Sequence, residues 1–258
     1  MGAMDDTLRP ESYGERVADV YDDWFPARGA QVAAVAAFLH ARAGAAVGEG
    51  SGPALELGIG TGRVALPLAA LGTPVVGIDA SPRMLARLRD KPGGADIPVA
   101  VGDFAGVDAP GGPFALVYVV FNTFFALLDQ ESQVRCLANA ARALRPGGHL
   151  VMEAFVPDPA RYPNGQHVVA EEMTGEETRL IAATHDPLTQ RIRARRLVLG
   201  PTGVRTFPVE LRYAWPSELD LMARLAGLDL TERWAGWSGE PFTASSGAHV
   251  SVWRTRPS

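Results

Sequence analysis

Residues 56–62, Glu-Leu-Gly-Ile-Gly-Thr-Gly, form a glycine-rich loop whose chemistry can be stated from residue types alone. The apolar run before the loop predicts a strand, and the spacing of apolar residues after it predicts a helix. Glycines allow a sharp turn and let a ligand approach the backbone without a Cβ in the way, while a helix N-terminus offers unpaired N–H groups. The loop therefore predicts a site for a cofactor with a polar tail.

The glycine spacing argues against a dinucleotide. A dinucleotide fingerprint needs Gly-x-Gly-x-x-Gly, but here Gly62 comes one residue early and Arg63 occupies the expected place. The segment instead resembles motif I of the class I S-adenosylmethionine-dependent methyltransferases, which reads acidic-x-Gly-x-Gly-x-Gly. This resemblance implies that Glu56, Gly58, Gly60 and Gly62 surround the methionyl part of S-adenosylmethionine, or of its product S-adenosylhomocysteine.

Two further acidic residues lie where the same family has them. Asp79 ends a second apolar run 23 residues after Glu56 (79 − 56), and Gly102-Asp103-Phe104 ends a third. The resemblance implies that Asp79 accepts hydrogen bonds from the ribose hydroxyls, which suits a carboxylate. It also implies that Asp103 holds the adenine amino group while Phe104 covers the ring.

The resemblance extends to residues 144–148, Leu-Arg-Pro-Gly-Gly, which are similar to the family's turn before the fifth strand. Side chains next to the motifs complete the predicted cofactor site. These are Tyr21, Arg63, Ala80, Met84 and Phe121.

Residues 121–125, Phe-Asn-Thr-Phe-Phe, correspond to the family segment beside the transferred methyl group. We expect a functional role for Asn122, because the C-terminal edge of its strand opens on the cofactor. Phe124 and Phe125 have two open interpretations. They either bound an apolar acceptor or cap the core.

Methyl transfer depends on alignment of the reactants and exclusion of water, and a hydroxyl acceptor also benefits from a general base. Histidine is the natural base, and His167, His185 and His249 are the available candidates. We name His185, His249 and Asn122 as catalytic candidates, although His185 is also typical of an exposed hairpin end. No His, Asp and Glu cluster has metal-ligand spacing, so we expect no metal ion.

The motifs require a frame of alternating strands and helices. Strands are predicted at 53–57, 75–78, 97–101, 115–121 and 149–155, with helices at 62–71, 82–90 and 131–144. This order is typical of parallel strands with crossover helices, a doubly wound α/β sheet. After a helix at 217–226, strands at 228–234 and 249–253 close the chain. The resemblance implies a Rossmann-like sheet of seven strands, mostly parallel, with the last strand antiparallel.

Two segments lie outside this frame. Residues 157–214 alternate apolar and charged residues between turn signals, which predicts an inserted antiparallel meander. Two helices are predicted over residues 11–43, interrupted at Pro26. We therefore divide the chain into a helical cap (1–50), a cofactor-binding core (51–156 and 215–258) and a meander that acts as a substrate lid (157–214).

The overall composition limits the possible partners. A net charge of -5 argues against a nucleic-acid surface, and no apolar run approaches the ~20 residues that span a membrane. A single cysteine, Cys136, favours a reducing compartment, so we expect a cytoplasmic protein.

The resemblance implies methyl transfer to nitrogen or oxygen of a small-molecule acceptor, similar to a secondary metabolite, by a monomer or homodimer. One alternative is a protein that binds the cofactor without transferring methyl groups. A nicotinamide-dependent oxidoreductase is another, but its Tyr-x-x-x-Lys pattern is missing.

Overall fold

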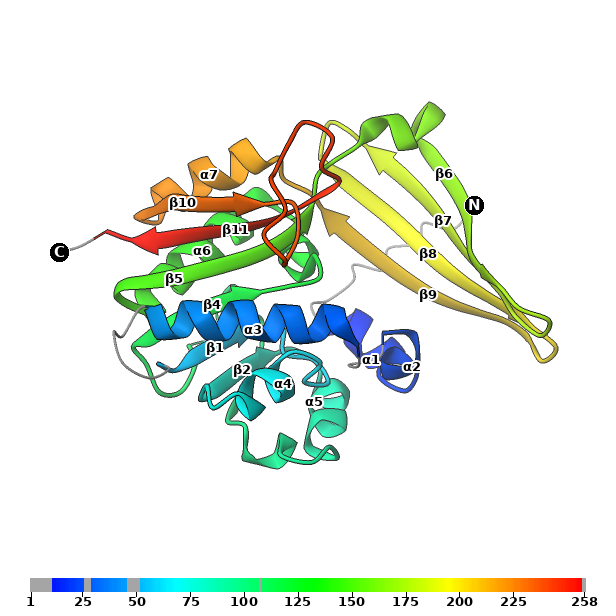
Figure 1. The fold of residues 1–258 in the computed structure, drawn as a ribbon. Helices are drawn as coiled ribbons and strands as arrows, with labels where there is room; N and C mark the ends of the chain where they lie inside the picture. The colour runs from blue at the N-terminus through cyan, green and yellow to red at the C-terminus, as the bar shows by residue number, and fades with distance from the viewer. Residues whose placement is uncertain (1–10, 26–28, 46–51, 107, 257–258) are drawn as a thin grey trace.

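The protein contains two β-sheets. One has seven strands and helices on both faces, and the other is a separate sheet of four strands (Figure 1). The structure is a computed structural model and describes residues 11–25, 29–45, 52–106 and 108–256. The four-stranded sheet projects from one end of the larger one, with the first two helices below it in the view of Figure 1.

The large sheet has the predicted arrangement, with strand order β10-β11-β5-β4-β1-β2-β3. Neighbouring strands among β1 to β5 pair in parallel, and β11 runs antiparallel to both β5 and β10. The strands are β1 (Ala54–Leu57), β2 (Val75–Asp79), β3 (Val99–Val101), β4 (Phe114–Val119), β5 (Leu144–Phe155), β10 (Leu228–Trp234) and β11 (Ala248–Thr255). The predicted fold class is confirmed.

Helices cover both faces because the central strands are apolar on both sides. All six residues of β4 are buried, with Tyr118 in one core layer and Val117 in the other. The helices are α3 (Ala30–Ala45), α4 (Ala65–Ala70) and α5 (Pro82–Arg89) on the Tyr118 side, and α6 (Gln130–Ala143) and α7 (Pro216–Leu225) on the other. Ser81 caps α5 by accepting a hydrogen bond from the N–H of Met84.

The four-stranded sheet is the predicted meander. Its strands pair in sequence order and antiparallel, with hairpin turns at the predicted signals. They are β6 (Gln166–Met173), β7 (Thr178–Asp186), β8 (Arg191–Gly200) and β9 (Gly203–Arg212).

The N-terminal segment differs from the prediction of two helices. It forms three, α1 (Ser12–Val17), α2 (Tyr21–Trp24) and α3. The first helix ends where the Val20 N–H bonds to the Val17 carbonyl, three residues back, which stops the α-helical hydrogen-bond ladder. Three parts of the predicted organisation lie outside the described residues. They are residues 1–10 of the predicted cap, Pro26, and residues 46–51 at the predicted boundary between cap and core.

Two strand boundaries also differ from prediction. β4 ends at Val119, because Phe121 (φ 55) and Asn122 (φ 63) adopt left-handed backbone conformations before the short helix η2 (Thr123–Ala126). The Pro-Gly-Gly turn of residues 146–148 lies within β5 as an irregularity. Phe114 of β4 pairs with Leu144, but two residues later Leu116 pairs with His149.

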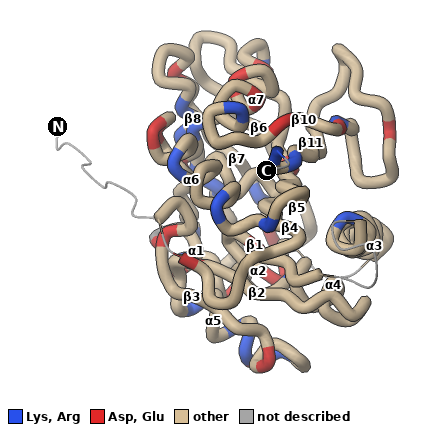
Figure 2. The backbone as a smooth tube through the Cα atoms, turned by 90° about the vertical axis from the view of Figure 1, so that its left-hand side faces the viewer, with Lys and Arg blue, Asp and Glu red and all other residues tan. Residues whose placement is uncertain are grey.

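Charged residues of both signs are interspersed in the view of Figure 2, in line with the expectation against a nucleic-acid surface. Among the described residues, no helix is long and apolar enough to cross a membrane.

Candidate active site

The glycine-rich loop leaves β1 in a conformation that favours glycine at three positions. Gly58, Gly60 and Gly62 have φ angles of 74, 54 and 79°. A Cβ at Gly58 would lie 2.5 Å from Cγ2 of Thr123, and one at Gly62 would lie 2.4 Å from Cδ1 of Leu88. Gly58 and Gly62 are therefore required for packing as well as for the turn.

Asp79 ties this loop to the end of β2. Its Oδ2 accepts a hydrogen bond from the Gly60 N–H at 2.7 Å, and its Oδ1 accepts one from the Ser81 N–H at 2.8 Å. Burial raises the pKa of the Asp79 carboxyl, and the backbone N–H donors partly oppose this rise. The carboxyl group is thus held at the cavity wall where the C-terminal ends of β1 and β2 meet.

Glu56 is a second carboxyl group under the loop, and it is only 3% exposed. Tyr118 donates its hydroxyl hydrogen to Oε2 of Glu56 at 3.0 Å. Burial raises the pKa of Glu56 to about 8. A cation placed beside Glu56 would favour its ionised form.

Arg63 places a cation at the edge of the same cavity. Its guanidinium carbon lies 3.9 Å from the ring centroid of Phe121 and 5.9 Å from that of Phe25. Its Nε atom is buried and has no hydrogen-bond partner within the part of the chain that the structure describes. Because Arg63 lines the cavity, its guanidinium is suited to bind a carboxylate ligand there.

Side chains of the N-terminal helices α1 and α2 form hydrogen bonds with the glycine-rich loop and with residues around α5. Thr61 donates to Oδ1 of Asp22 at 2.6 Å, and Nζ of Lys91 donates to the same oxygen at 2.9 Å. Ser81 donates to Oε1 of Glu15 at 2.6 Å. These contacts from both α1 and α2 hold the N-terminal segment across the mouth of the cavity.

Two adjoining cavities occupy this region. The first, the glycine-loop cavity, has a volume of about 150 Å³, and the second, the meander cavity, has about 650 Å³. They share lining residues, including Tyr21, Arg63, Asp103 and Phe121, and therefore lie side by side.

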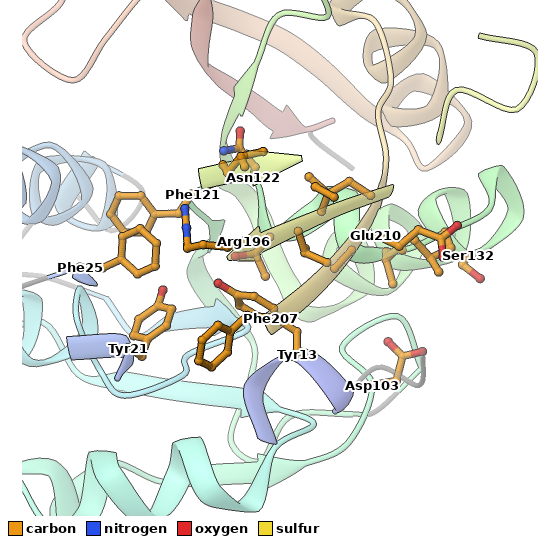
Figure 3. A pocket seen from close by; sticks show the side chains of 18 of the residues that line it. Tyr13, Tyr21, Phe25, Asp103, Phe121, Asn122, Ser132, Arg196, Phe207 and Glu210 are labelled. Atoms are coloured by element: carbon orange, nitrogen blue, oxygen red, sulfur yellow. The ribbon is translucent and has the colours of Figure 1, made fainter. Parts of the chain in front are cut away.

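The walls of the meander cavity come from the N-terminal helices, from the segment after β4 and from the meander. Figure 3 shows the rings of Tyr13, Tyr21, Phe25 and Phe207 close together at one side of it. Arg196 of β8 also lines the cavity, and its guanidinium binds both carboxylate oxygens of Glu171.

Most of the predicted cofactor residues line the glycine-loop cavity. They are Tyr21, Glu56, Gly58, Gly60, Arg63, Asp79, Ala80, Met84, Asp103, Phe104 and Phe121. Gly62 and Gly102 are not among its lining residues, and Gly62 instead makes room for Leu88 of α5.

The sequence prediction of the cofactor site omitted several lining residues, among them Tyr13, Gly14, Thr123, Ala126 and Leu127. A Cβ on Gly14 would lie 2.6 Å from Cβ of Ser81, so Gly14 lets α1 approach the start of α5. No local pattern signals this, because one glycine in a helical segment has no fixed meaning without its neighbour in space.

The three predicted catalytic residues lie in different places. Asn122 lines the meander cavity, and its Oδ1 accepts a hydrogen bond from the Phe155 N–H at 2.7 Å. His185 lies outside both cavities, with its Nε2 2.9 Å from the Tyr213 hydroxyl. His249 is also outside them and fully buried, its Nδ1 2.9 Å from Oγ of Ser251. Burial lowers the pKa of His249 to about 4.

The position of Phe124 and Phe125 decides between their two interpretations. Phe124 and Phe125 are fully buried in the core between β4, β5 and α6, so they cap the core and do not line the cavities. Among the described residues, no group of three or more His, Cys, Asp or Glu could hold a metal ion.

Comparison with known proteins agrees with this geometry. A family described as "Methyltransferase domain" matches residues 54–148. The cypemycin N-terminal methyltransferase of a Streptomyces species is 33% identical over 195 residues, which cover 74% of this chain and 78% of the relative. The chain belongs to the class I S-adenosylmethionine-dependent methyltransferases.

Solved structures of methyltransferases agree over nearly the whole chain. The CcbJ methyltransferase from Streptomyces caelestis has a TM-score of 0.87 and 41% identity, covering 96% of this chain and 99% of its own. CalS10, an amino pentose methyltransferase from Micromonospora echinaspora solved with S-adenosylmethionine bound, has a TM-score of 0.69 and 26% identity. That alignment covers 92% of this chain and 97% of CalS10.

The residues of this methyltransferase fit S-adenosylmethionine, which supplies an electrophilic methyl group on a sulfonium centre. Arg63 and Glu56 both line the glycine-loop cavity. The guanidinium of Arg63 can bind a carboxylate, and an ammonium group beside Glu56 would favour the ionised form of that residue. Asp79 offers hydrogen-bond acceptors at the far side of the loop.

Proposed function

We propose that this methyltransferase transfers its methyl group to an amine nitrogen of a small-molecule acceptor, similar to a secondary metabolite, bound in the meander cavity. One observation carries the choice of nitrogen over oxygen. Among the described residues that line this cavity there is no histidine, lysine or cysteine, so it lacks a side chain whose ordinary pKa suits a general base near pH 7. A neutral amine needs no such base.

Apart from Asp103, which the family resemblance assigns to the adenine, the other carboxyl and phenol groups that line the cavity are unsuited to removing a hydroxyl proton. Burial raises the pKa of Tyr13 and raises that of Tyr21 to about 12, so both phenols keep their protons near neutral pH. Asp129 caps α6 by accepting a hydrogen bond from the Ser132 N–H, which lowers its pKa. Glu210 forms a salt bridge with Arg193 at 3.0 Å.

The size and lining of the cavity favour a compact, partly apolar acceptor. Its volume of about 650 Å³ lies in the range of small-molecule sites, and the rings of Phe25 and Phe207 form part of its wall. The names of two relatives point to nitrogen acceptors, since one acts at the N-terminus of cypemycin and the other on an amino pentose. Both support the proposal for an amine.

We also propose roles for the parts of the chain around the acceptor. The N-terminal cap and the meander act together as the cover of the acceptor, and Asn122 shapes the wall beside the donor. His185 and His249 lie outside both cavities, so we assign neither a role in proton transfer. The buried free thiol of Cys136 supports a reducing, cytoplasmic location. A monomer or homodimer is the proposed assembly.

The test uses matched acceptors that differ only in carrying an amine or a hydroxyl at one position, such as an amino sugar and its parent sugar. We expect methyl transfer to the amine alone, detected by mass spectrometry. The rate should rise with pH until the amine itself is deprotonated. Methylation of the hydroxyl compound, with a pH profile set by a group on the enzyme, would overturn the proposal.

Two variants separate the acceptor site from the donor site. Phe207→Leu changes only the meander cavity, so it should raise KM for the acceptor and leave the affinity for S-adenosylhomocysteine unchanged. Asp79→Asn should do the reverse, because Asp79 lines only the glycine-loop cavity. Calorimetry and steady-state kinetics measure the two effects, and equal effects of Phe207→Leu on both ligands would contradict this division.

A further inference from the structure

Glu153 on β5 lies behind the wall that the two cavities share, and it lines neither of them. Each oxygen of its carboxylate accepts one N–H donor. Oε2 accepts the backbone N–H of Phe121 at 2.9 Å, and Oε1 accepts the indole N–H of Trp237 at 2.9 Å. The carboxylate thus connects two segments that are more than a hundred positions apart in sequence.

The first of these segments is the left-handed turn at the end of β4. Phe121 and Asn122 have φ angles of 55 and 63°, which cost free energy in residues with a side chain and persist only where the surroundings impose them. Glu153 supplies that constraint twice. Its side chain binds the Phe121 N–H, and its backbone carbonyl accepts the Asn122 N–H at 3.4 Å.

Phe121 links this turn to the cofactor site. Phe121 lines both cavities, and its ring supports the Arg63 guanidinium, whose carbon lies 3.9 Å from the ring centroid. A change in the backbone at Phe121 would move this ring and the cation on it.

The second segment holds the carboxylate in place. Trp237 lies between β10 and β11 and is 8% exposed, and its ring packs edge-on against Phe38 of α3 with centroids 5.5 Å apart. The indole is therefore fixed by the main core. Because Trp237 donates to Oε1, the carboxylate is oriented so that Oε2 faces the Phe121 N–H.

We propose that Glu153 is a positioning residue for cofactor binding: oriented by Trp237, it holds the Phe121 turn and so places Arg63 for the carboxylate of S-adenosylmethionine. The inference concerns the methyl donor and is independent of the proposed amine acceptor. It can fail while the acceptor proposal stands, and the reverse also holds.

The test measures binding of S-adenosylhomocysteine by calorimetry, which needs no catalytic turnover. Glu153→Gln keeps the shape of the side chain, but its single amide oxygen cannot accept both N–H donors. We expect the Kd to rise roughly tenfold, the scale of one lost hydrogen bond to a charged group. Trp237→Phe removes the orienting donor together with part of the buried ring, and it should raise the Kd by about threefold.

Trp234→Phe is the matched control. Its indole N–H also donates to a carboxylate at 2.9 Å, Oε2 of Glu232, but neither residue lines a cavity. The control should leave the Kd unchanged. A double-mutant cycle of Glu153→Gln with Phe121→Leu should show that the two effects do not add, because both act through the same turn.

A purely structural role for Glu153 gives a different result. It would lower the melting temperature in Glu153→Gln and Trp237→Phe while leaving the Kd for S-adenosylhomocysteine at the wild-type value, and this outcome would overturn the proposal. Additive effects of Glu153→Gln and Phe121→Leu would overturn it as well. If Glu153→Gln does not fold, Trp237→Phe against Trp234→Phe still decides the question.

Discussion

At the scale of single residues, burial shifts the pKa values of Glu56 and His249 in opposite directions. Glu56 rises from its ordinary 4.5 to about 8, and His249 falls from 6.5 to about 4, because removal from water disfavours the charged form of each. Both residues are thus neutral over much of the range near pH 7. Because one pKa is raised and the other is lowered, Glu56 makes the free energy of unfolding fall as pH rises, whereas His249 makes it fall as pH drops.

The Glu56 effect can be isolated between pH 6.5 and 8. There the unfolded chain has an ionised Glu56 while the folded, ligand-free protein keeps the proton, so the free energy of unfolding should fall as pH rises. His249 contributes mainly below about pH 7, where its stabilising effect is lost as the pH falls toward 4. Glu56→Gln should remove about 2 kcal/mol of the decline over this window, measured by urea unfolding.

The comparison for Glu56 is Tyr118→Phe. This variant removes the hydrogen bond that lowers the pKa of Glu56, so it should keep the decline and extend it to higher pH. A wild-type slope in Glu56→Gln between pH 6.5 and 8 would show that another group causes the decline.

At the scale of elements, the meander is fastened to the core by a buried polar network at its base. Arg212, at the end of β9, is 6% exposed and forms a salt bridge with Glu218 of α7 at 2.8 Å. It also donates to Oε1 of Gln133 on α6. At 2.9 Å it donates to Oε1 of Gln190, which lies in the turn between β7 and β8. One guanidinium thus orients the sheet relative to both helices.

Arg212→Met should destabilise the protein by roughly 3 kcal/mol, because it leaves a half-buried carboxylate without its charged partner. Arg205→Met is the control, since Arg205 is 51% exposed where it pairs with Glu177 near the tip of the meander. Its expected cost is below about 0.5 kcal/mol. Chemical denaturation measures both, and equal losses would contradict a special role for Arg212.

At the scale of the whole molecule, three distant parts of the chain meet around the two adjoining cavities. Residues of the glycine-rich loop, of the meander and of the N-terminal helices α1 and α2 line them. Asp22 is the clearest link between the N-terminal helices and the loop, since it accepts hydrogen bonds from Thr61 and Lys91.

Asp22→Asn should therefore weaken S-adenosylhomocysteine binding by roughly threefold to tenfold, because a charged hydrogen-bond acceptor for Lys91 is lost. Asp23→Asn is the matched control on the same helix, with an exposed side chain. Calorimetry at two salt concentrations measures the affinities. Equal Kd values for the two variants would show that Asp22 does not fasten the N-terminal segment.

The sequence by itself determined the features that depend on local pattern. Continuous apolar runs between helical segments predicted the parallel sheet, because a strand buried on both faces must be apolar throughout. The resemblance of the segments around Glu56, Asp79 and Asp103 to the family's motifs predicted the cofactor wall. The three residues lie at or just after the C-terminal ends of β1, β2 and β3, which reach the same edge of the sheet. Turn residues at three sites predicted the meander.

The tertiary structure decided what depends on contacts between distant segments. Whether a histidine reaches the site is fixed by packing, which leaves His185 against Tyr213 and buries His249 beside Ser251. The left-handed turn at Phe121 was hidden because the carboxylate that accepts the Phe121 N–H, that of Glu153, lies on the neighbouring strand. The reason for a glycine at position 14 appears only in the folded chain, where a Cβ would lie 2.6 Å from Cβ of Ser81. The spacing of residues in the sequence determines which face of a helix or strand a side chain lies on. Only the packing of distant segments determines which residues that side chain contacts.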